Sequence, residues 1–296
     1  MENITFNGWN CIRLANGKVE LIITRDVGPR VARFAFIKGK NVFAEVVGQQ
    51  GGQGEDEYRV RGGHRFWIAP ESMPWSYELD NVPYEAATKI KDGVRVRQAP
   101  GPVTKIAKQM DITLDPVEAK VKIRHTLTNR GKKAALCAPW ALSVMAQKGQ
   151  AIIPLPAKIA HTDRLTHNQQ WSLWGYSDFS DPRWSFIPGY IFLRQDPKRG
   201  PTKIGIAHEE KWVAYQTNGD LFVKHFDFKP GAKYPDGGCS FESFTHQEFL
   251  ELESLGPLVE LAPGASVKHD ECWELFAGVP LCKSSADVDK HVRPLV

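Results

Sequence analysis

The most constraining feature of the chain is a strict alternation of residue types in its middle. From Val117 to Asn129 the odd positions are mostly apolar, and the even positions are all charged or hydroxyl-bearing. Successive side chains of a β-strand point to opposite faces of the sheet, so this pattern predicts a strand with one buried and one solvated face. His125 falls on the apolar face. A buried histidine needs a hydrogen-bond partner, so His125 is either a satisfied core residue or a catalytic one.

Short segments of similar character, separated by turns rich in glycine and proline, follow one another along the chain. The expected strands are Lys18–Thr24, Val31–Phe36, Val42–Val47, Ala135–Met145, Tyr190–Arg194, Lys203–His208, Trp212–Gln216, Leu221–Phe226, Ser240–Thr245, Glu248–Ser254 and Ser266–Phe276. One short C-terminal helix is expected near Ser284 to Val292, because Ser284 and Asp287 have the spacing of a capping box. No linker or repeat interrupts the chain. The sequence therefore predicts a single all-β domain over residues 1–296, built as a large antiparallel β-sandwich.

Composition narrows the class of protein. Of the 296 residues, 42% are hydrophobic and 24% are charged. No apolar run approaches the ~20 residues that a membrane helix needs, so no membrane association is expected. The N-terminal residues lack the basic start and apolar core of a signal peptide, which favours a cytoplasmic location, with export after removal of a signal as the alternative. The net charge of +4 comes without a lysine or arginine block, which argues against nucleic acid.

The cysteines indicate a reducing compartment. There are five, an odd number, and they are widely scattered without a CxxC pair. This pattern argues against a disulfide framework and against a zinc site. The sequence therefore predicts neither a metal nor a cofactor.

The stretch from Gly62 to Glu71 carries the densest set of functional side chains. Its two leading glycines allow a close backbone approach that other residues resist. His64 can exchange a proton near neutral pH, and Arg65 offers a rigid fork of donors to oxygen-rich groups. Trp67 supplies a flat apolar face of the kind on which sugars stack, and Glu71 adds a carboxylate. The stretch is either a binding segment or a glycine-rich turn that leads into an edge strand.

A second candidate segment contains two glutamates that alternate with leucines. Leu250 and Leu252 point to one face of the expected strand, and Glu251 and Glu253 point to the other. If the leucines face the core, the glutamates are either solvated or form a pair of carboxylates ~7 Å apart along a binding face. Like charges so placed raise one pKa, which suits a general base or acid.

Several motifs together resemble the galactose mutarotase-like superfamily, which includes the aldose 1-epimerases. The motifs are Gly62–Glu71, His125–Asn129, Ala138–Leu142, Tyr234–Gly238, Phe249–Leu258, Leu261–Gly264 and Cys272–Leu275. Within that superfamily the chain most resembles a bacterial family of unassigned function, DUF4380. The resemblance implies a large β-sandwich whose concave face binds carbohydrate.

The resemblance also implies roles for particular residues. The base glutamate of the epimerases corresponds to Glu251, with Glu253 as the second match. Epimerases have a histidine in a His-Pro-Tyr-Phe-like run, where this sequence reads Ala138-Pro139-Trp140-Ala141 and has none. Mutarotation needs a base for the anomeric hydroxyl and an acid for the ring oxygen. The remaining candidates for the acid are His64, His125 and His225.

Three functions stay open, all with a carbohydrate as the partner. The first is a sugar epimerase in which Glu251 is the base, a histidine is the acid, and His64 and Arg65 share one cleft with the glutamates. The second is a polysaccharide lyase in which Arg65 or Lys224 neutralises a uronate while a histidine or tyrosine abstracts its C5 proton. The third is a non-catalytic sugar-binding protein. The residues expected to contact the sugar are Arg65, Trp67, Glu71, Trp140, Lys224 and Glu253. The sequence leaves the oligomeric state open.

Overall fold

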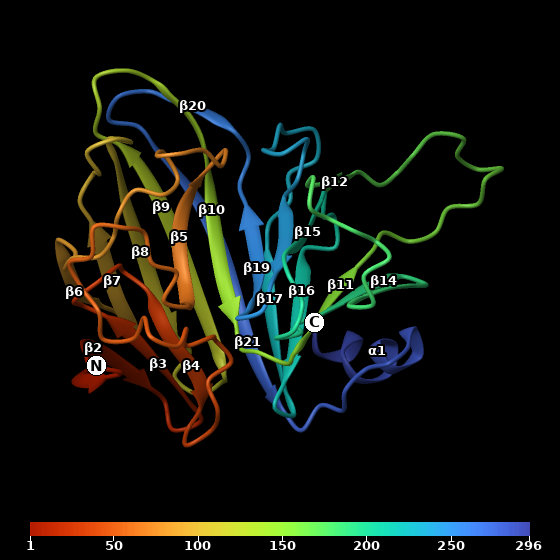
Figure 1. Ribbon diagram of the computed structural model, residues 1–296, viewed down its shortest axis with the longest axis horizontal. Helices are drawn as coiled ribbons and strands as arrows, with labels where there is room; N and C mark the ends of the chain where they lie inside the picture. Colours follow the sequence, from red (N-terminus) through yellow and green to blue (C-terminus); the bar gives the residue numbers. More distant parts are fainter.

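A computed structural model describes residues 1–296 and places them in two antiparallel sheets (Figure 1). The eleven-stranded sheet has the spatial order β1 (Glu2–Phe6), β2 (Trp9–Ala15), β3 (Val19–Thr24), β4 (Val31–Phe36), β5 (Gly63–Ala69), β10 (Ala135–Met145), β19 (Leu250–Leu255), β18 (Phe241–Thr245), β15 (Thr202–Ile206) and β12 (Trp171–Leu173), with β20 (Val259–Leu261) also paired to β10. The ten-stranded sheet has the order β13 (Trp184–Ile187), β14 (Tyr190–Arg194), β11 (Gln150–Pro154), β16 (Trp212–Thr217), β17 (Asp220–Phe226), β21 (Ser266–Ala277), β9 (Lys120–Asn129), β8 (Ile106–Leu114), β7 (Gly93–Gln98) and β6 (Ala86–Ile90). This architecture confirms the predicted antiparallel β-sandwich.

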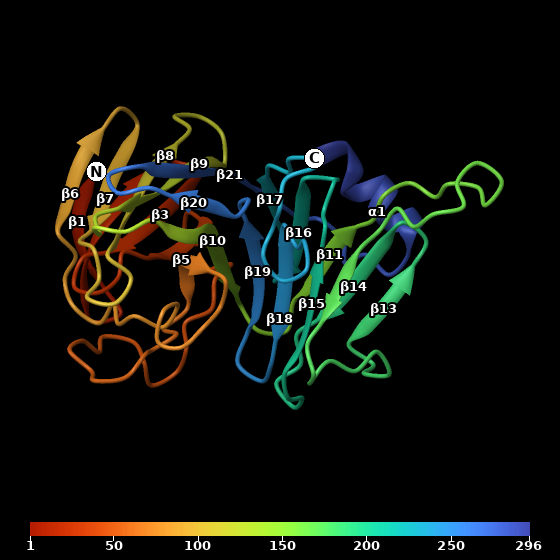
Figure 2. The same ribbon diagram turned by 90° about the horizontal axis from the view of Figure 1, so that it is seen from above.

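The main core lies between the two sheets. Figure 2 shows β9 and β21 in one layer and β5 and β10 in the other. Forty buried apolar residues fill the space between the layers, Leu250 and Leu252 of β19 among them. In β9 the buried and more exposed positions alternate as predicted, with Val121 and Ile123 in the core.

Two expectations for the strands fail. Residues 42–47 form only isolated bridges, although Phe43 is buried in the main core and Val46 in a small separate cluster with Val144 and Phe249. The Gly62–Glu71 stretch does not form an edge strand. Its strand, β5, pairs along its length with β10 and contacts β4, and every residue of β5 is buried.

The paired glycines before β5 serve backbone packing. Gly62 and Gly63 have φ angles of +97° and +76°. A Cβ atom on Gly62 would lie 1.9 Å from the carbonyl oxygen of Ala44, and one on Gly63 would lie 2.5 Å from that of Val31. The close approach that the sequence predicted is therefore made to neighbouring backbone.

The C-terminal helix α1 (Ser285–His291) begins at the predicted capping box, and a short 3₁₀ helix (Arg293–Leu295) follows it. Its buried residue Val288 packs against Leu221 and Val223 of β17, on the outer side of the ten-stranded sheet. No helix in the structure is long and apolar enough to cross a membrane.

Candidate functional site

Five neighbouring strands of the eleven-stranded sheet present polar and aromatic side chains on the face turned away from the main core. The strands are β5, β10, β19, β18 and β15. We call their residues the outer-face cluster: Arg65, Trp67, Trp140, Lys203, Glu242, Glu251 and Glu253. Because Leu250 and Leu252 face the core, alternation turns Glu251 and Glu253 to this outer face. The members of the cluster are only 0–6% exposed, so the two glutamates are not solvated surface residues.

Arg65 and Glu251 form one half of the cluster. Arg65 Nη2 donates to Glu251 Oε1 at 3.0 Å, although 186 residues separate the two in sequence. The guanidinium lies over the indole of Trp67, 4.5 Å from the ring centre, while its Nε and Nη1 atoms are buried without a hydrogen-bond partner. Burial raises the pKa of Glu251 to about 7, with Arg65 opposing and Glu253 adding to the rise. Glu251 is therefore a carboxyl that exchanges a proton near neutral pH.

Lys203 organises the other half. Its Nζ lies 2.6 Å from Glu242 Oε2 and 3.2 Å from Glu253 Oε2, so one ammonium serves two carboxyl groups. Burial raises the pKa of Glu242 well above its ordinary value despite the opposing Lys203. Burial also opposes the charge of Lys203, but Glu253 and Glu242 outweigh it and raise the pKa of the ammonium. Trp140 Nε1 donates to Glu253 Oε2 at 3.0 Å.

Aromatic side chains pack beside and over the polar groups. Tyr58 and Tyr77 meet the ring of Trp67 at centroid distances of 5.3 and 5.0 Å. On the other side, Trp140 and Trp174 lie 5.1 and 4.5 Å from the Lys203 ammonium. The outer-face cluster thus combines charged hydrogen-bonding groups with indole and phenol rings.

The remaining residue predicted on this side, Glu71, lies at the periphery. It is exposed and accepts a hydrogen bond from the hydroxyl group of Tyr77.

Three of the predicted site residues lie on the opposite side of the eleven-stranded sheet, between the two sheets. His64 and His125 are fully buried, and their Nε2 atoms are 2.9 Å apart. Lys224 is also fully buried, with its Nζ 2.8 Å from Glu271 Oε1. The expectation that His64 shares a cleft with Arg65 and the glutamates is therefore wrong, because consecutive residues of a strand point to opposite faces.

His64 and His125 are both uncharged at neutral pH. Burial lowers the pKa of His125 to about 3 and that of His64 well below its ordinary value. His125 Nδ1 lies 3.1 Å from the carbonyl oxygen of His269, and its Nε2 faces His64 Nε2.

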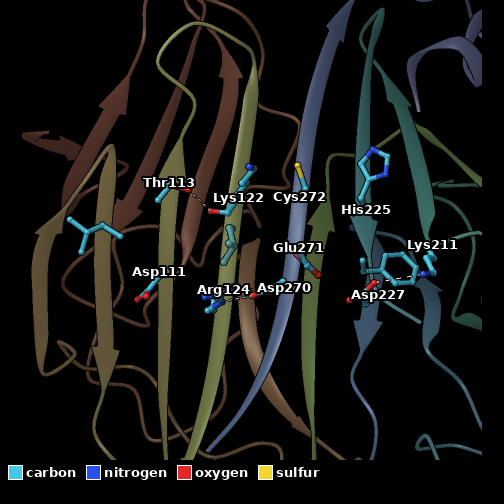
Figure 3. A pocket seen from close by; sticks show the side chains of 13 residues that line it. Asp111, Thr113, Lys122, Arg124, Lys211, His225, Asp227, Asp270, Glu271 and Cys272 are labelled. Atoms are coloured by element: carbon cyan, nitrogen blue, oxygen red, sulfur yellow. Dashed lines mark hydrogen bonds and ion pairs between the residues drawn. The ribbon is translucent and has the colours of Figure 1, made fainter. Parts of the chain in front are cut away.

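The third candidate acid, His225, lies on the outer face of the ten-stranded sheet. Figure 3 shows it beside a shallow groove of about 670 Å³ that crosses β8, β9, β21 and β17. Charged residues in this groove pair across strands, as Arg124 does with Asp270 at 2.9 Å. His225 is thus on a different sheet from the outer-face cluster, which belongs to the eleven-stranded sheet. No histidine of the chain hydrogen-bonds to a member of that cluster.

The sequence analysis missed Lys203 and Glu242. Both occupy predicted strands. Lys203 precedes the core residue Ile204, and Glu242 follows the core residue Phe241. The available signal was a charged residue directly beside an apolar one, Glu242 after Phe241 and Lys203 before Ile204. What the sequence lacks is the order of the strands, which brings β15 and β18 beside β19.

Solved structures with a similar fold cover nearly the whole chain. A galactose mutarotase-like protein from Lactobacillus casei has a TM-score of 0.55 at 12% identity, over 90% of this chain and 100% of that one. The chain has the galactose mutarotase-like fold. A candidate aldose 1-epimerase from Klebsiella pneumoniae gives a TM-score of 0.59 at 12% identity, over 92% of this chain and 79% of that one. The Slr1438 protein from Synechocystis sp. PCC 6803 gives 0.61 at 13% identity, over 94% and 100%.

At such identities these similarities establish the fold and leave the chemistry to the site. No protein-family model and no curated protein sequence matches the chain. The closer resemblance to DUF4380 therefore stays a prediction.

Proposed function

We propose that the outer-face cluster binds a carbohydrate and that Glu251 acts on it as the general base of an epimerase-like proton transfer. The observation that carries this proposal is the state of Glu251. Its carboxyl group is buried and accepts a hydrogen bond from Arg65, and burial raises the pKa of Glu251 to about 7. A base whose pKa lies near the working pH combines a useful ionised fraction with a strong affinity for the proton.

The surroundings of Glu251 suit a polyhydroxyl ligand. Buried polar groups are normally hydrogen-bonded, yet several in this cluster have no partner within the protein. They are Nε and Nη1 of Arg65, Oε1 of Glu253, Oε1 of Glu242, and the nearby Tyr58 hydroxyl. Hydroxyl groups of a sugar both donate and accept, so they satisfy donors and acceptors of this kind together. The indoles of Trp67 and Trp140 supply the apolar faces.

The acid of the proposed reaction is a carboxyl group. With no histidine hydrogen-bonded to the cluster, we assign the acid to Glu242, because burial raises its pKa well above the ordinary value. It stands directly across from Glu253 in the β18–β19 pair. In the proposal Glu251 takes the proton of the anomeric hydroxyl, and Glu242 protonates the ring oxygen.

Exchange of anomers tests this proposal. Saturation-transfer NMR on a panel of monosaccharides measures the exchange rate, and saturation-binding measurements give the affinity. Glu251→Gln keeps the shape and the bond from Arg65, so it should slow exchange ~100-fold or more while affinity changes little. Glu248→Gln, in the exposed turn before β19, is the matched control and should leave the rate unchanged. The wild-type rate should rise with pH through about 7, as Glu251 ionises.

A second function, sugar binding without turnover, is favoured by the absence of a histidine from the cluster. It predicts saturable binding with unchanged anomers, and the largest loss of affinity from Trp67→Ala. The lyase alternative gains no such support, because Lys224 lies between the sheets and Arg65 is already paired with Glu251. A new unsaturated uronate absorbance on incubation with polyuronates would restore it and refute the epimerase.

A further inference from the structure

The space between the sheets holds a second polar cluster that the proposed function does not use. His64 of β5, His125 of β9 and Glu271 of β21 meet there, and each is at most 3% exposed. The Nε2 atoms of the two histidines are 2.9 Å apart, and Glu271 Oε2 lies 3.9 Å from His64 Nε2. All three atoms lie within 4.8 Å of one another.

Hydrogen bonds behind the two imidazoles aim them at one point. His125 Nδ1 lies 3.1 Å from the carbonyl oxygen of His269, so it carries the proton and leaves Nε2 with a free lone pair. His64 Nδ1 lies 3.0 Å from the hydroxyl oxygen of Ser143, which can accept in the same way. Metal-binding histidines in proteins typically donate their second ring nitrogen to a carbonyl or another oxygen, as both do here.

The carboxylate is held just as firmly. Trp273 Nε1 donates to Glu271 Oε2 at 2.8 Å, and Lys224 Nζ lies 2.8 Å from Oε1. Lys224 therefore pairs with Oε1 of Glu271, and Oε2 is the carboxylate oxygen that faces the imidazole of His64. A tetrahedral zinc ion with bonds of ~2.0–2.2 Å separates its ligand atoms by about 3.4 Å. The distances of 2.9 and 3.9 Å bracket that value.

We propose that His64, His125 and Glu271 bind a divalent transition-metal ion, zinc first of all, between the two sheets. Two imidazoles and one carboxylate suit zinc or its transition-metal neighbours better than the all-oxygen preference of calcium and magnesium. The ligands come from both sheets, so the ion ties β5 to β9 and β21. The three residues supply three of the four ligands of a tetrahedral ion and leave the fourth position to a water molecule. Since none of the three is exposed, the ion would hold the sheets together and would not meet a substrate.

The alternative for these residues is a hydrogen-bonded chain without a metal. In that chain Lys224 donates to Ser143, Ser143 to His64 Nδ1, His64 Nε2 to His125 Nε2, and His125 Nδ1 to the carbonyl of His269. It satisfies the same groups, so only measurement of bound metal separates the two.

Metal analysis of the full chain, expressed without a histidine tag and purified without chelator, provides the test. Elemental analysis should find about one zinc or related ion per chain. Cobalt(II) incorporated during refolding should give the intense visible bands of a tetrahedral site. His64→Gln and His125→Gln should each lose the ion, whereas His225→Gln, on the outer face of the ten-stranded sheet, should retain it.

Thermal unfolding supplies a second readout in case the variants fold poorly. A chelator present during refolding should lower the melting temperature of the wild-type protein, and added zinc should restore it. Wild-type protein refolded with zinc that holds less than about a tenth of an ion per chain, shows no cobalt bands and melts identically with and without chelator would overturn the proposal. That result would assign the residues to the hydrogen-bonded chain.

Discussion

Replacing Lys203 by methionine should destabilise the fold strongly. Lys203 is 4% exposed and is the one cation that the structure pairs with Glu242 and Glu253. Methionine keeps an apolar stem of similar length against Trp140 and Trp174, so the change removes mainly the charge. Removal of one partner of a buried ion pair typically costs 3–5 kcal/mol, because the other charge stays buried without compensation. We therefore expect the free energy of unfolding to fall by about 3–5 kcal/mol at neutral pH.

The loss should depend on pH in a defined direction. Burial already raises the folded-state pKa of Glu242 above its ordinary value of 4.5. A carboxyl with a raised folded-state pKa contributes stability that is fully present below its unfolded pKa and is lost as pH rises through the folded one. Without the Lys203 ammonium this folded-state pKa rises further. The deficit of Lys203→Met relative to the wild type should therefore grow between about pH 5 and about pH 8.

Urea unfolding, followed by tryptophan fluorescence and circular dichroism at both pH values, measures this deficit. Lys211→Met is the matched control, because the Lys211 side chain is 54% exposed and its partner Asp227 is 3.9 Å away. Exposed pairs of this kind are worth little, so the control should stay within about 0.5 kcal/mol of the wild type. Equal effects of the two substitutions, or a deficit that shrinks as pH rises, would refute the account of the Lys203 cluster.

Two further predictions concern parts of the molecule away from the site. Ser284→Ala removes the N-cap of α1 and should lower the free energy of unfolding in urea by about 1 kcal/mol. Ser284→Thr keeps a capping hydroxyl and should lower it clearly less, so equal losses would count against the cap. The five cysteines are free, and burial raises the pKa of all five thiols, to about 12 for Cys11. The thiolate is the reactive form, so near neutral pH a thiol reagent should label only the part-exposed Cys272 at an appreciable rate until urea unfolds the chain. Rapid labelling of several cysteines in the folded protein would contradict the burial of the other four thiols.

Much of the fold follows from local patterns. Alternation alone predicts β9 and β19 and assigns the two faces of each, because a period of two matches the geometry of a strand. The capping box at Ser284 predicts α1 in the same way. Residues 42–47 show the limit of such reasoning. Their apolar side chains are buried as a strand's would be, but hydrophobicity does not reveal that the backbone makes only isolated bridges there.

The candidate site was predictable only in part. The resemblance pointed to Glu251, and the same alternation that separates Glu251 from Leu250 also separates Arg65 from His64. Applied to β5, it would have shown that both residues cannot line one cleft. The partnership of Arg65 with Glu251 and the place of Lys203 depend on long-range strand order and register, which a single sequence does not contain.

The two polar clusters both include residues of β5, and this affects how variants must be interpreted. His64 and Arg65 are neighbours on β5, and Lys224, from the opposite sheet, donates to the carbonyl oxygen of Leu252, between Glu251 and Glu253. A change in the interior cluster therefore acts on the backbone that positions the outer-face cluster. Loss of turnover in a His64 variant would not show that His64 touches a sugar. Loss of activity in Glu251→Gln with unchanged stability would, by contrast, locate the chemistry on the outer face.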